Sequence, residues 1–308
     1  MNRCPITLEP CGAHQYSEKG LQLLSPRLTK LRDFPYSRTE QLEQAAAHAS
    51  KLSIQGVQAK LSVRLNAGQS VFEIVDTRGT FIVKPPHPIF PEIVENEDVT
   101  MRLARASGIS LPLSGMIYAK DKSLSYFIKR FDRIGHDKRL ATEDFAQLSG
   151  HARDTKYDSS MEQVAAVIEK FCTFPAIEKV RLFRLTIFSF LVGNEDMHLK
   201  NFSLISRDGK VELSPAYDLL NTTIVLKTKE ELALPLMGRK SGLKRQHLLD
   251  YFSIKRLGLP ERLANRELDS FAGLQATWQD LIGNSFLSSP MQAKYLDLMR
   301  MRSKTLFG

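Results

Sequence analysis

The hydrophobic pattern of this chain changes near residue 140, and the change limits the folds it can adopt. Before that point, apolar and polar residues alternate in short runs separated by Gly, Pro, Asn and Asp, which is typical of β-strands. From about Glu143 onward, the apolar spacing is mostly helical. We therefore expect an α+β fold, in which a small sheet-rich lobe precedes a larger helical lobe.

Helices and strands are predicted along most of the chain. Residues 1–37 look like an irregular leading segment, and helices are predicted over 38–51 and 92–107, the second ending at Gly108. The predicted strands of the first part are 61–65, 71–75, 80–83, 114–119 and 125–130, the first three forming an antiparallel meander. In the second part we expect helices at 143–150, 160–171, 176–193 and within 246–306, and short strands at 202–206 and 210–213.

Composition excludes several classes of protein. The 308 residues are 43% hydrophobic and 25% charged, an ordinary globular mixture. The most apolar run, 185–194, is far shorter than the ~20 residues of a membrane span. Three cysteines and the lack of a visible signal peptide predict a cytoplasmic protein. The net charge of +9 leaves open whether an anionic partner or solubility alone explains it.

A polar segment between an apolar helix and a strand carries the sharpest chemical signal. Residues 194–201 read NEDMHLKN, and Asp196 and Asn201 stand five positions apart. This is the Asp-to-Asn spacing of a protein-kinase catalytic loop. There the Asp orients or deprotonates the attacking hydroxyl, while the Asn oxygen binds Mg²⁺. The segment therefore predicts phosphoryl transfer.

Three more residues follow in the order that a kinase requires. Lys84 ends the apolar strand FIVK, and a buried lysine is costly unless it meets an anion such as a phosphate. Glu97 follows thirteen residues later on the next predicted helix and is placed to pair with Lys84, although Glu95 and Asp98 compete for that role. The strand before Asp218 delivers it to a turn, where a kinase places its second Mg²⁺ ligand, but the usual Asp-Phe-Gly is absent.

Together these pieces resemble the HipA-like serine/threonine kinase toxins of bacteria, over residues 50–300. The matching segments include SIQGVQAK, FIVK, YFIKRFDR, EDFAQLSG, GNEDMHLKNFS and SPAYDLLN. The resemblance implies a two-lobed protein-kinase-like fold and an enzyme that uses ATP and Mg²⁺. Residues 1–51 would be an N-terminal segment, 52–135 the N-lobe, and 136–308 the helical C-lobe.

The resemblance also implies roles for individual residues. Asp196 would be the catalytic base, and Asn201 and Asp218 would bind Mg²⁺. The residues implied to contact the nucleotide are Gln55, Gly56, Val57, Gln58, Ala59, Lys60, Lys84, Lys129, Arg130, Phe131, His198, Leu199, Lys200, Asn201, Tyr217 and Asp218. Ser53 resembles a family serine whose autophosphorylation ejects the loop and switches the kinase off. The plainer interpretations are a turn hydroxyl for Ser53 and a packing histidine for His198.

Partners follow from the same resemblance. About 50 residues precede the loop, where full-length HipA toxins carry a further subdomain of ~100 residues. This resembles the short HipT form of HipBST-type toxin–antitoxin systems, whose missing subdomain is a separate small HipS-like antitoxin. A HipB-like helix-turn-helix repressor would give indirect association with DNA. The implied substrate is a serine of an aminoacyl-tRNA synthetase, with the glutamyl and tryptophanyl enzymes as family precedents, and its phosphorylation would inhibit translation.

An inactive kinase-like scaffold in a repressor complex is the alternative function. The intact set of Lys84, Asp196, Asn201 and Asp218 argues against a pseudokinase. No helix-turn-helix with adjacent basic residues is evident in the sequence, which argues against direct reading of DNA bases.

Overall fold

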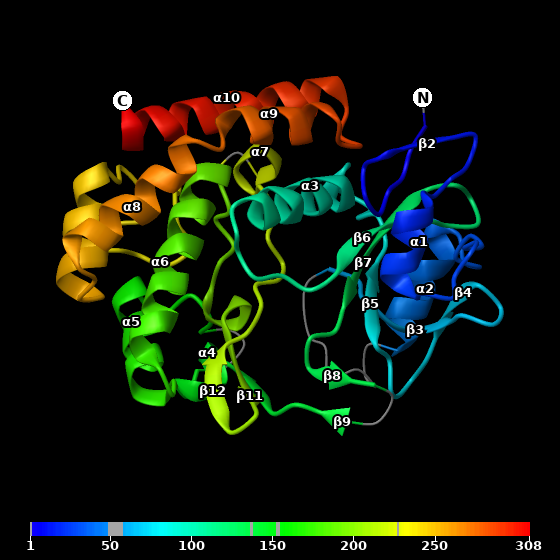
Figure 1. Ribbon diagram of the computed structural model, residues 1–308, viewed down its shortest axis with the longest axis horizontal. Helices are drawn as coiled ribbons and strands as arrows, with labels where there is room; N and C mark the ends of the chain where they lie inside the picture. The colour runs from blue at the N-terminus through cyan, green and yellow to red at the C-terminus, as the bar shows by residue number, and fades with distance from the viewer. Residues whose placement is uncertain (1, 49–57, 136–137, 152–154, 227) are drawn as a thin grey trace. The chain divides into compact units, whose positions relative to one another are not determined.

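The computed structural model describes residues 2–48, 58–135, 138–151, 155–226 and 228–308 (Figure 1). The chain forms two compact units. The N-terminal unit comprises Met1–Val99, Pro112–Lys138 and Asn284–Leu287, and the C-terminal unit comprises Thr100–Leu111, Arg139–Gly283 and Ser288–Gly308. The division falls inside helix α3 (Ile93–Ala106).

The N-terminal unit is built on a five-stranded antiparallel sheet. Its elements are β1 (Asn2–Arg3), β2 (Pro10–Gly12), α1 (Glu18–Leu24), α2 (Arg38–His48), β3 (Leu61–Asn66), β4 (Val71–Ile74), β5 (Phe81–Lys84), β6 (Ser114–Tyr118), β7 (Leu124–Lys129) and β8 (Arg133–Ile134). The strand order in the sheet is β4-β3-β5-β7-β6. β8 pairs separately with β9 (Lys138–Arg139).

The meander predicted for the first three strands is wrong in its order. β3 lies between β4 and β5, so Leu61 stands opposite Val83 of β5. The link from β4 to β5 stays close to β3, since the backbone N–H of Thr80 donates to the carbonyl of Val63 at 3.0 Å. Gly79 makes this approach possible, because a Cβ there would overlap Oγ of Ser62. The run-by-run pattern identified the strands, but this close approach decides their order.

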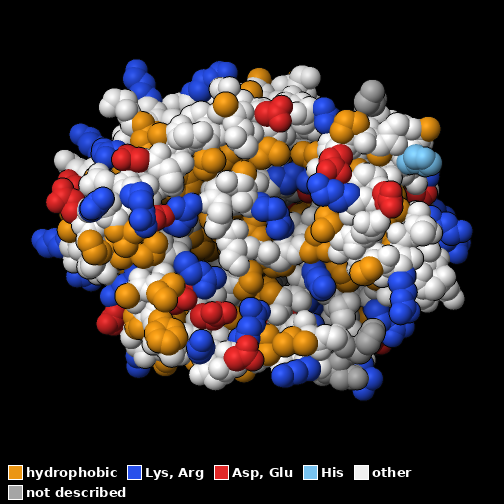
Figure 2. Space-filling model, in the orientation of Figure 1, with side chains coloured by type: hydrophobic (Ala, Val, Ile, Leu, Met, Phe, Trp, Pro, Cys, Tyr) orange, Lys and Arg blue, Asp and Glu red, His pale blue; other side chains and the backbone are white. Residues whose placement is uncertain are grey.

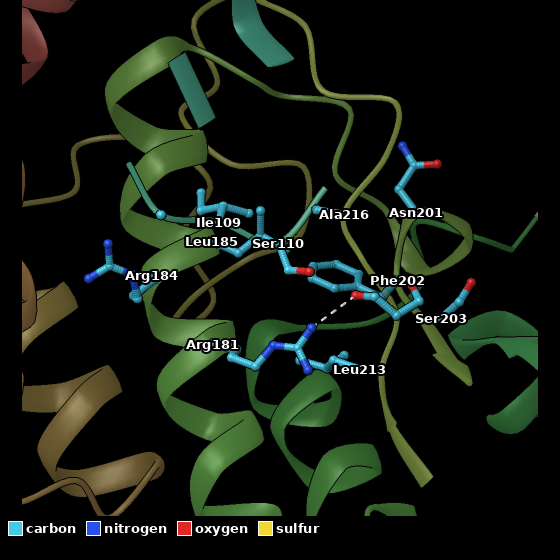
Figure 3. A pocket seen from close by; sticks show the side chains of 12 residues that line it. Ile109, Ser110, Arg181, Arg184, Leu185, Asn201, Phe202, Ser203, Leu213 and Ala216 are labelled. Carbon is cyan, nitrogen blue, oxygen red and sulfur yellow. Dashed lines mark hydrogen bonds between the residues drawn. The ribbon is translucent and has the colours of Figure 1, made fainter. Parts of the chain in front are cut away.

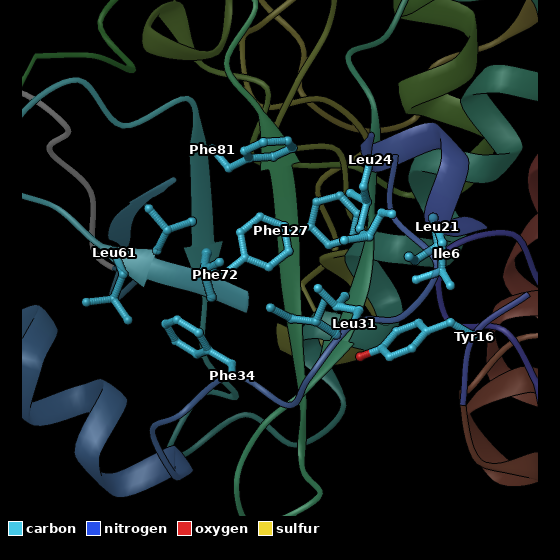
Figure 4. Packing of buried hydrophobic residues seen from close by; sticks show 14 of the residues in the cluster. Ile6, Tyr16, Leu21, Leu24, Leu31, Phe34, Leu61, Phe72, Phe81 and Phe127 are labelled. Atoms are coloured by element: carbon cyan, nitrogen blue, oxygen red, sulfur yellow. The ribbon is translucent and has the colours of Figure 1, made fainter. Parts of the chain in front are cut away.

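The first 37 residues contain β1, β2 and α1, so the prediction of an irregular leading segment is wrong, and several of these residues belong to the core. Helix α1 begins after Ser17, whose hydroxyl accepts a hydrogen bond from the backbone N–H of Gly20. Buried residues from this region pack with the sheet in one hydrophobic cluster (Figure 4), including Ile6, Tyr16, Leu21, Leu24, Leu31, Phe34, Leu61, Phe72, Phe81 and Phe127. The rings of Phe72 and Phe81 meet edge-on, with centroids 5.2 Å apart.

The C-terminal unit is mostly helical. Its elements are β10 (Thr142–Asp144), α4 (Phe145–Leu148), α5 (Met161–Phe171), α6 (Pro175–Val192), the 3₁₀-helix η1 (Leu199–Asn201), β11 (Ser203–Arg207), β12 (Lys210–Leu213), α7 (Thr223–Leu226), the π-helix η2 (His247–Arg256), α8 (Glu261–Ala272), α9 (Gln275–Gly283) and α10 (Ser289–Phe307). The central helix α6 packs against α5, α8 and α10.

The helix predicted over 143–150 begins later than expected. Thr142–Asp144 instead pair with β11 as strand β10, which completes a sheet in the order β10-β11-β12. Asp144 then caps α4, since its carboxylate accepts a hydrogen bond from the backbone N–H of Gln147 at 2.9 Å. The strand next to the candidate catalytic loop therefore has a paired neighbour on both sides.

The face drawn in Figure 2 shows charged side chains of both signs. On the face drawn in Figure 2, Lys and Arg side chains are scattered among Asp and Glu side chains. The net charge of +9 is therefore not gathered into a single basic surface on this face. In the described ranges, none of the helices combines the length and the apolar character needed to span a lipid bilayer.

Candidate active site

The segment between α6 and β11 forms a closed loop around Asp196. Helix α6 ends at Gly193, which has a left-handed φ of 69°, and a Cβ there would lie 2.5 Å from Cδ2 of Leu298. The side-chain amide of Asn201 donates to the backbone carbonyl of Asp196 at 2.7 Å. Within the described part of the chain, Oδ1 of Asn201 accepts no hydrogen bond. The loop therefore holds the predicted base and the predicted metal ligand in one fixed arrangement.

Two aromatic side chains surround the Asp196 carboxylate. The hydroxyl of Tyr157 donates to Oδ1 of Asp196 at 2.5 Å, and Nε2 of His198 lies 3.8 Å from the same oxygen. The two rings meet edge-on, with centroids 5.0 Å apart. Burial and the Asp196 carboxylate raise the pKa of Tyr157, so its hydroxyl stays protonated as the donor. Sequence reasoning missed Tyr157, because a single tyrosine in a polar stretch carries no recognisable pattern.

His198 is a buried histidine of the loop, 5% exposed. Burial lowers its pKa, although the carboxylates of Asp196 and Asp218 oppose this effect. Its neutral form is therefore favoured, and Nδ1 has no hydrogen-bond partner among the described residues. Because both carboxylates act on the same imidazole, Asp196, His198 and Asp218 lie in one region of the C-terminal unit.

Asp218 is held in an uncommon backbone conformation after β12. Its φ is 54°, in the left-handed region that non-glycine residues rarely occupy. The preceding Tyr217 is anchored through its hydroxyl, which lies 2.6 Å from Oγ of Ser203 and donates to the carbonyl of Lys200 at 2.9 Å. Its hydroxyl thereby joins the segment that carries Asp218 to the end of the candidate catalytic loop, and the predicted contact of Tyr217 with the nucleotide stays a prediction.

A buried charge cluster supports the loop. Arg302 of α10 is 3% exposed, with NH1 2.6 Å from Oε1 of Glu231 and NH2 3.7 Å from Oε1 of Glu195. Thr223 also donates to Oε1 of Glu195, at 2.5 Å. Burial raises the pKa of Glu195, and Thr223 and Arg302 oppose that effect. Glu195 directly precedes Asp196, so this ion pair links α10 to the candidate catalytic loop.

The N-terminal unit contains the predicted lysine–glutamate pair. Nζ of Lys84 lies 2.5 Å from Oε1 of Glu97, and the two residues are 2% and 1% exposed. The same Nζ is 5.5 Å from the ring centre of Tyr126. Glu95, Glu97 and Asp98 of α3 were all candidates to pair with Lys84. In the structure, Glu97 forms the ion pair. A charge pair this deeply buried often adds little net stability compared with apolar side chains of similar size. Stability alone therefore does not explain the pair, and a functional role is favoured.

Another carboxylate of α3 predicts a measurable pH effect. Burial raises the pKa of Glu95 to about 7, with Glu92 and Asp98 adding to the shift. The folded protein therefore keeps this proton where the unfolded chain loses it, and stability should fall as pH rises from about 4.5 to 7. At pH 8 we expect Glu95→Gln to stabilise the protein by on the order of 1–3 kcal/mol, with little effect at pH 4. Urea unfolding across this range tests it.

The control for this prediction is Glu43→Gln, which changes an exposed carboxylate on α2. That variant should follow the pH dependence of the unchanged protein. A Glu95→Gln variant with the same pH slope as the unchanged protein would contradict the assignment.

The other predicted nucleotide residues are less constrained. Ser53, Gln55, Gly56 and Val57 lie outside the described residues. Gln58, Ala59 and Lys60 are partly buried just before β3, Leu199 is buried, and Lys200 is partly exposed. At the predicted hinge, Lys129 is exposed and Phe131 is partly buried. The Arg130 guanidinium pairs with the carboxylate of Asp132 at 3.0 and 2.9 Å, so it is already engaged inside its own unit.

Comparison with known proteins identifies the family of this chain. Residues 52–278 match the model of the HipA-like C-terminal domain. The chain belongs to this family. A protein of Haemophilus influenzae that carries a provisional kinase name is 31% identical to this HipA-like chain over 264 residues, which are 79% of this chain and 75% of that protein. The serine/threonine-protein kinase toxin HipA of Shewanella oneidensis is 27% identical over 207 residues, 60% of this chain and 47% of the toxin.

Solved structures show the same fold. The Shewanella oneidensis HipA, solved with HipB and operator DNA, superposes with a TM-score of 0.69 at 21% identity, covering 98% of this chain and 77% of that one. The proinflammatory kinase CtkA of Helicobacter pylori gives a TM-score of 0.59 at 17% identity, covering 83% and 92%. The expected kinase-like α+β fold of this HipA-like protein is thereby confirmed, whereas the short HipT form stays a prediction.

Proposed function

We propose that this HipA-like protein is a serine/threonine kinase that transfers the γ-phosphoryl group of ATP to a protein hydroxyl. The observation that carries the proposal is the loop in which Asn201 is hydrogen-bonded to the carbonyl of Asp196 at 2.7 Å. Phosphoryl transfer depends chiefly on positioning and electrostatics, and this loop fixes a carboxylate and an amide oxygen together. The kinase names of its relatives support the same conclusion.

Each residue of the proposed mechanism has one task. Asp196 accepts the hydrogen bond of the acceptor hydroxyl and orients it for attack. Lys84, steadied by Glu97, contacts the phosphates of ATP. Nothing in the geometry requires Asp196 to be a strong base, because the transition state of this reaction is loose and little proton transfer is needed early.

The residues present fit Mg²⁺ as the metal. Asn201 and Asp218 supply hard oxygen donors, and Oδ1 of Asn201 accepts no hydrogen bond from the described residues. Across those residues, no three or more His, Cys, Asp and Glu side chains gather as a complete metal site. That agrees with a metal held by one or two protein oxygens together with substrate phosphates. When bound, Mg²⁺ neutralises charge on the phosphates.

The biological role is proposed by similarity to the Shewanella toxin. We propose a toxin of a toxin–antitoxin system that acts with a HipB-like repressor, because that HipA was solved with HipB and operator DNA. An aminoacyl-tRNA synthetase as the substrate, Ser53 as an autophosphorylation site and a HipS-like antitoxin remain proposals from the family resemblance. Phosphoproteomics after induced expression identifies the substrate directly. A target outside the synthetases would contradict the proposal that an aminoacyl-tRNA synthetase is the substrate.

Replacing Lys84 with Met tests the nucleotide site. The change removes a buried cation that the proposal places on the phosphates, so we expect the KM for ATP to rise by about tenfold or more. The measurement is incorporation of label from γ-labelled ATP with Mg²⁺. Lys120→Met is the matched control, because its side chain in the same unit is 60% exposed and pairs only with Glu40 among the described residues. An unchanged KM in Lys84→Met would refute the assignment, and no label in the unaltered protein would favour the inactive scaffold.

A further inference from the structure

The C-terminal unit contains a cavity that the proposed kinase mechanism does not use. Its volume is about 220 Å³, and its apolar walls come from Ile109, Leu185, Phe202, Leu213 and Ala216 (Figure 3). A dry cavity of about 150 Å³ is enough to hold benzene. The space therefore accommodates a molecule of one or two fused rings, and a phenylalanine ring stands in its wall for such a molecule to pack against.

One cationic group faces this cavity. Arg181 and Arg184 both line it, but Figure 3 shows the Arg184 guanidinium turned away from the other lining side chains. Arg184 is engaged there by the carboxylate of Glu267, the carbonyl of Ser107 and the ring of Phe271. The Arg181 guanidinium points toward Phe202 instead, and its side chain is 31% exposed.

Arg181 has hydrogen-bonding capacity to spare. NH1 pairs with Oε2 of Glu178 at 2.8 Å, and NH2 reaches the carbonyl of Ser214 only at 3.5 Å. The guanidinium has more N–H donors than these two contacts use. Oε2 of Glu178 also accepts a hydrogen bond from the backbone N–H of Leu213 at 3.1 Å, so this oxygen is shared between Leu213 and Arg181. A second carboxylate at the cavity mouth would therefore find a planar, partly desolvated cation.

We propose that this cavity binds a small aromatic carboxylate, with its ring against Phe202 and Leu185 and its carboxylate on Arg181. An apolar chamber with one oriented polar group is the usual form of a small-molecule site. The chamber is distinct from the proposed metal site. Asn201 belongs to its lining, but its side chain turns away from Phe202 and Ile109 in Figure 3 and donates to the carbonyl of Asp196.

Calorimetric titration of the full chain with 2-naphthoate tests the proposal, and 2-naphthamide serves as the uncharged analogue. We expect saturable one-to-one binding, with naphthoate about tenfold tighter than naphthamide, because a hydrogen bond to a charged group contributes that much. Arg181→Met should remove the preference for the carboxylate and keep naphthamide binding. Arg207→Met is the control, since this arginine on β11 lies outside the cavity and also faces a glutamate, Glu212.

Ala216→Leu provides a second, independent variant, because its longer side chain fills the cavity. It should abolish binding of both compounds while far-UV circular dichroism stays unchanged. Absence of saturable binding up to about 1 mM of either compound in the unaltered protein would overturn the proposal. Binding that persists unchanged in both Ala216→Leu and Arg181→Met would also overturn it. None of these measurements depends on kinase activity, so they stand apart from the proposed function.

Discussion

Replacing Asp196 with Asn is expected to lower the rate of phosphoryl transfer by about 10²–10⁴-fold. The amide keeps the volume of the carboxylate, and its oxygen still accepts the hydrogen bond that Tyr157 donates at 2.5 Å. What is lost is the negative charge that orients and later deprotonates the acceptor hydroxyl. The rate of label transfer from ATP to a protein substrate measures this effect. ATP affinity should change little, because Asp196 is not among the proposed phosphate or metal contacts.

Asp208→Asn is the matched control for this substitution. Asp208 lies in the turn between β11 and β12 with a φ of 51°, a conformation that Asn tolerates as well as Asp. The same chemical change in the same unit should leave activity within about twofold of the unaltered protein. An Asp196→Asn variant that retains full activity would remove this residue from the mechanism and leave the loop as a structural feature.

Of the substitutions proposed here, Arg302→Met is expected to lower the free energy of unfolding the most. The change leaves Glu195 and Glu231 without their shared cation, and breaking a buried pair in this way costs about 3–5 kcal/mol. Urea unfolding followed by tryptophan fluorescence measures it, because the single tryptophan, Trp278, is buried in the same unit. Kinase activity should fall as well, since Glu195 adjoins Asp196.

Arg300→Met is the control on the same helix. Arg300 is 62% exposed and pairs with Asp297 at the surface, so its loss should cost less than about 1 kcal/mol. The double change Arg302→Met with Glu195→Gln should recover part of the lost stability, because it also removes one of the stranded carboxylates. Equal losses in the two arginine variants would show that the buried cluster contributes no more than a surface pair.

The parts of the site that were predictable lie close together in sequence. Asp196 and Asn201 belong to one loop, and Lys84 and Glu97 belong to a strand and the helix that follows it. Short-range spacing is enough to recognise such pairs, because helix and strand periodicities fix where nearby side chains point. The five strands of the main sheet in the first unit were found for the same reason, whereas the short strands β1, β2 and β8 were not.

The parts that were missed depend on distant contacts. Tyr157 meets Asp196 from a different segment, and Arg302 reaches Glu195 from more than a hundred residues away. The position of β3 between β4 and β5 likewise depends on tertiary pairing, which a run of alternating residues does not encode. The first 37 residues lack a regular pattern, yet several of them, such as Leu21 and Phe34, are buried in the cluster that they share with the sheet. Single-sequence patterns report local geometry and leave such partners unspecified.

The contacts at the end of helix α6 bear on when the loop around Asp196 becomes fully packed during synthesis of the chain. A Cβ at Gly193 would lie 2.5 Å from Cδ2 of Leu298, so α10 packs closely against this end of α6, and Arg302 of α10 pairs with the glutamate beside Asp196. Chains emerge from the ribosome with the N-terminus first, so these supports arrive only when α10 is made. A nascent chain that has already exposed the whole loop around Asp196 still lacks the packing and the counter-charge that α10 supplies. The loop around Asp196 therefore gains this packing and this counter-charge only after α10 has left the ribosome.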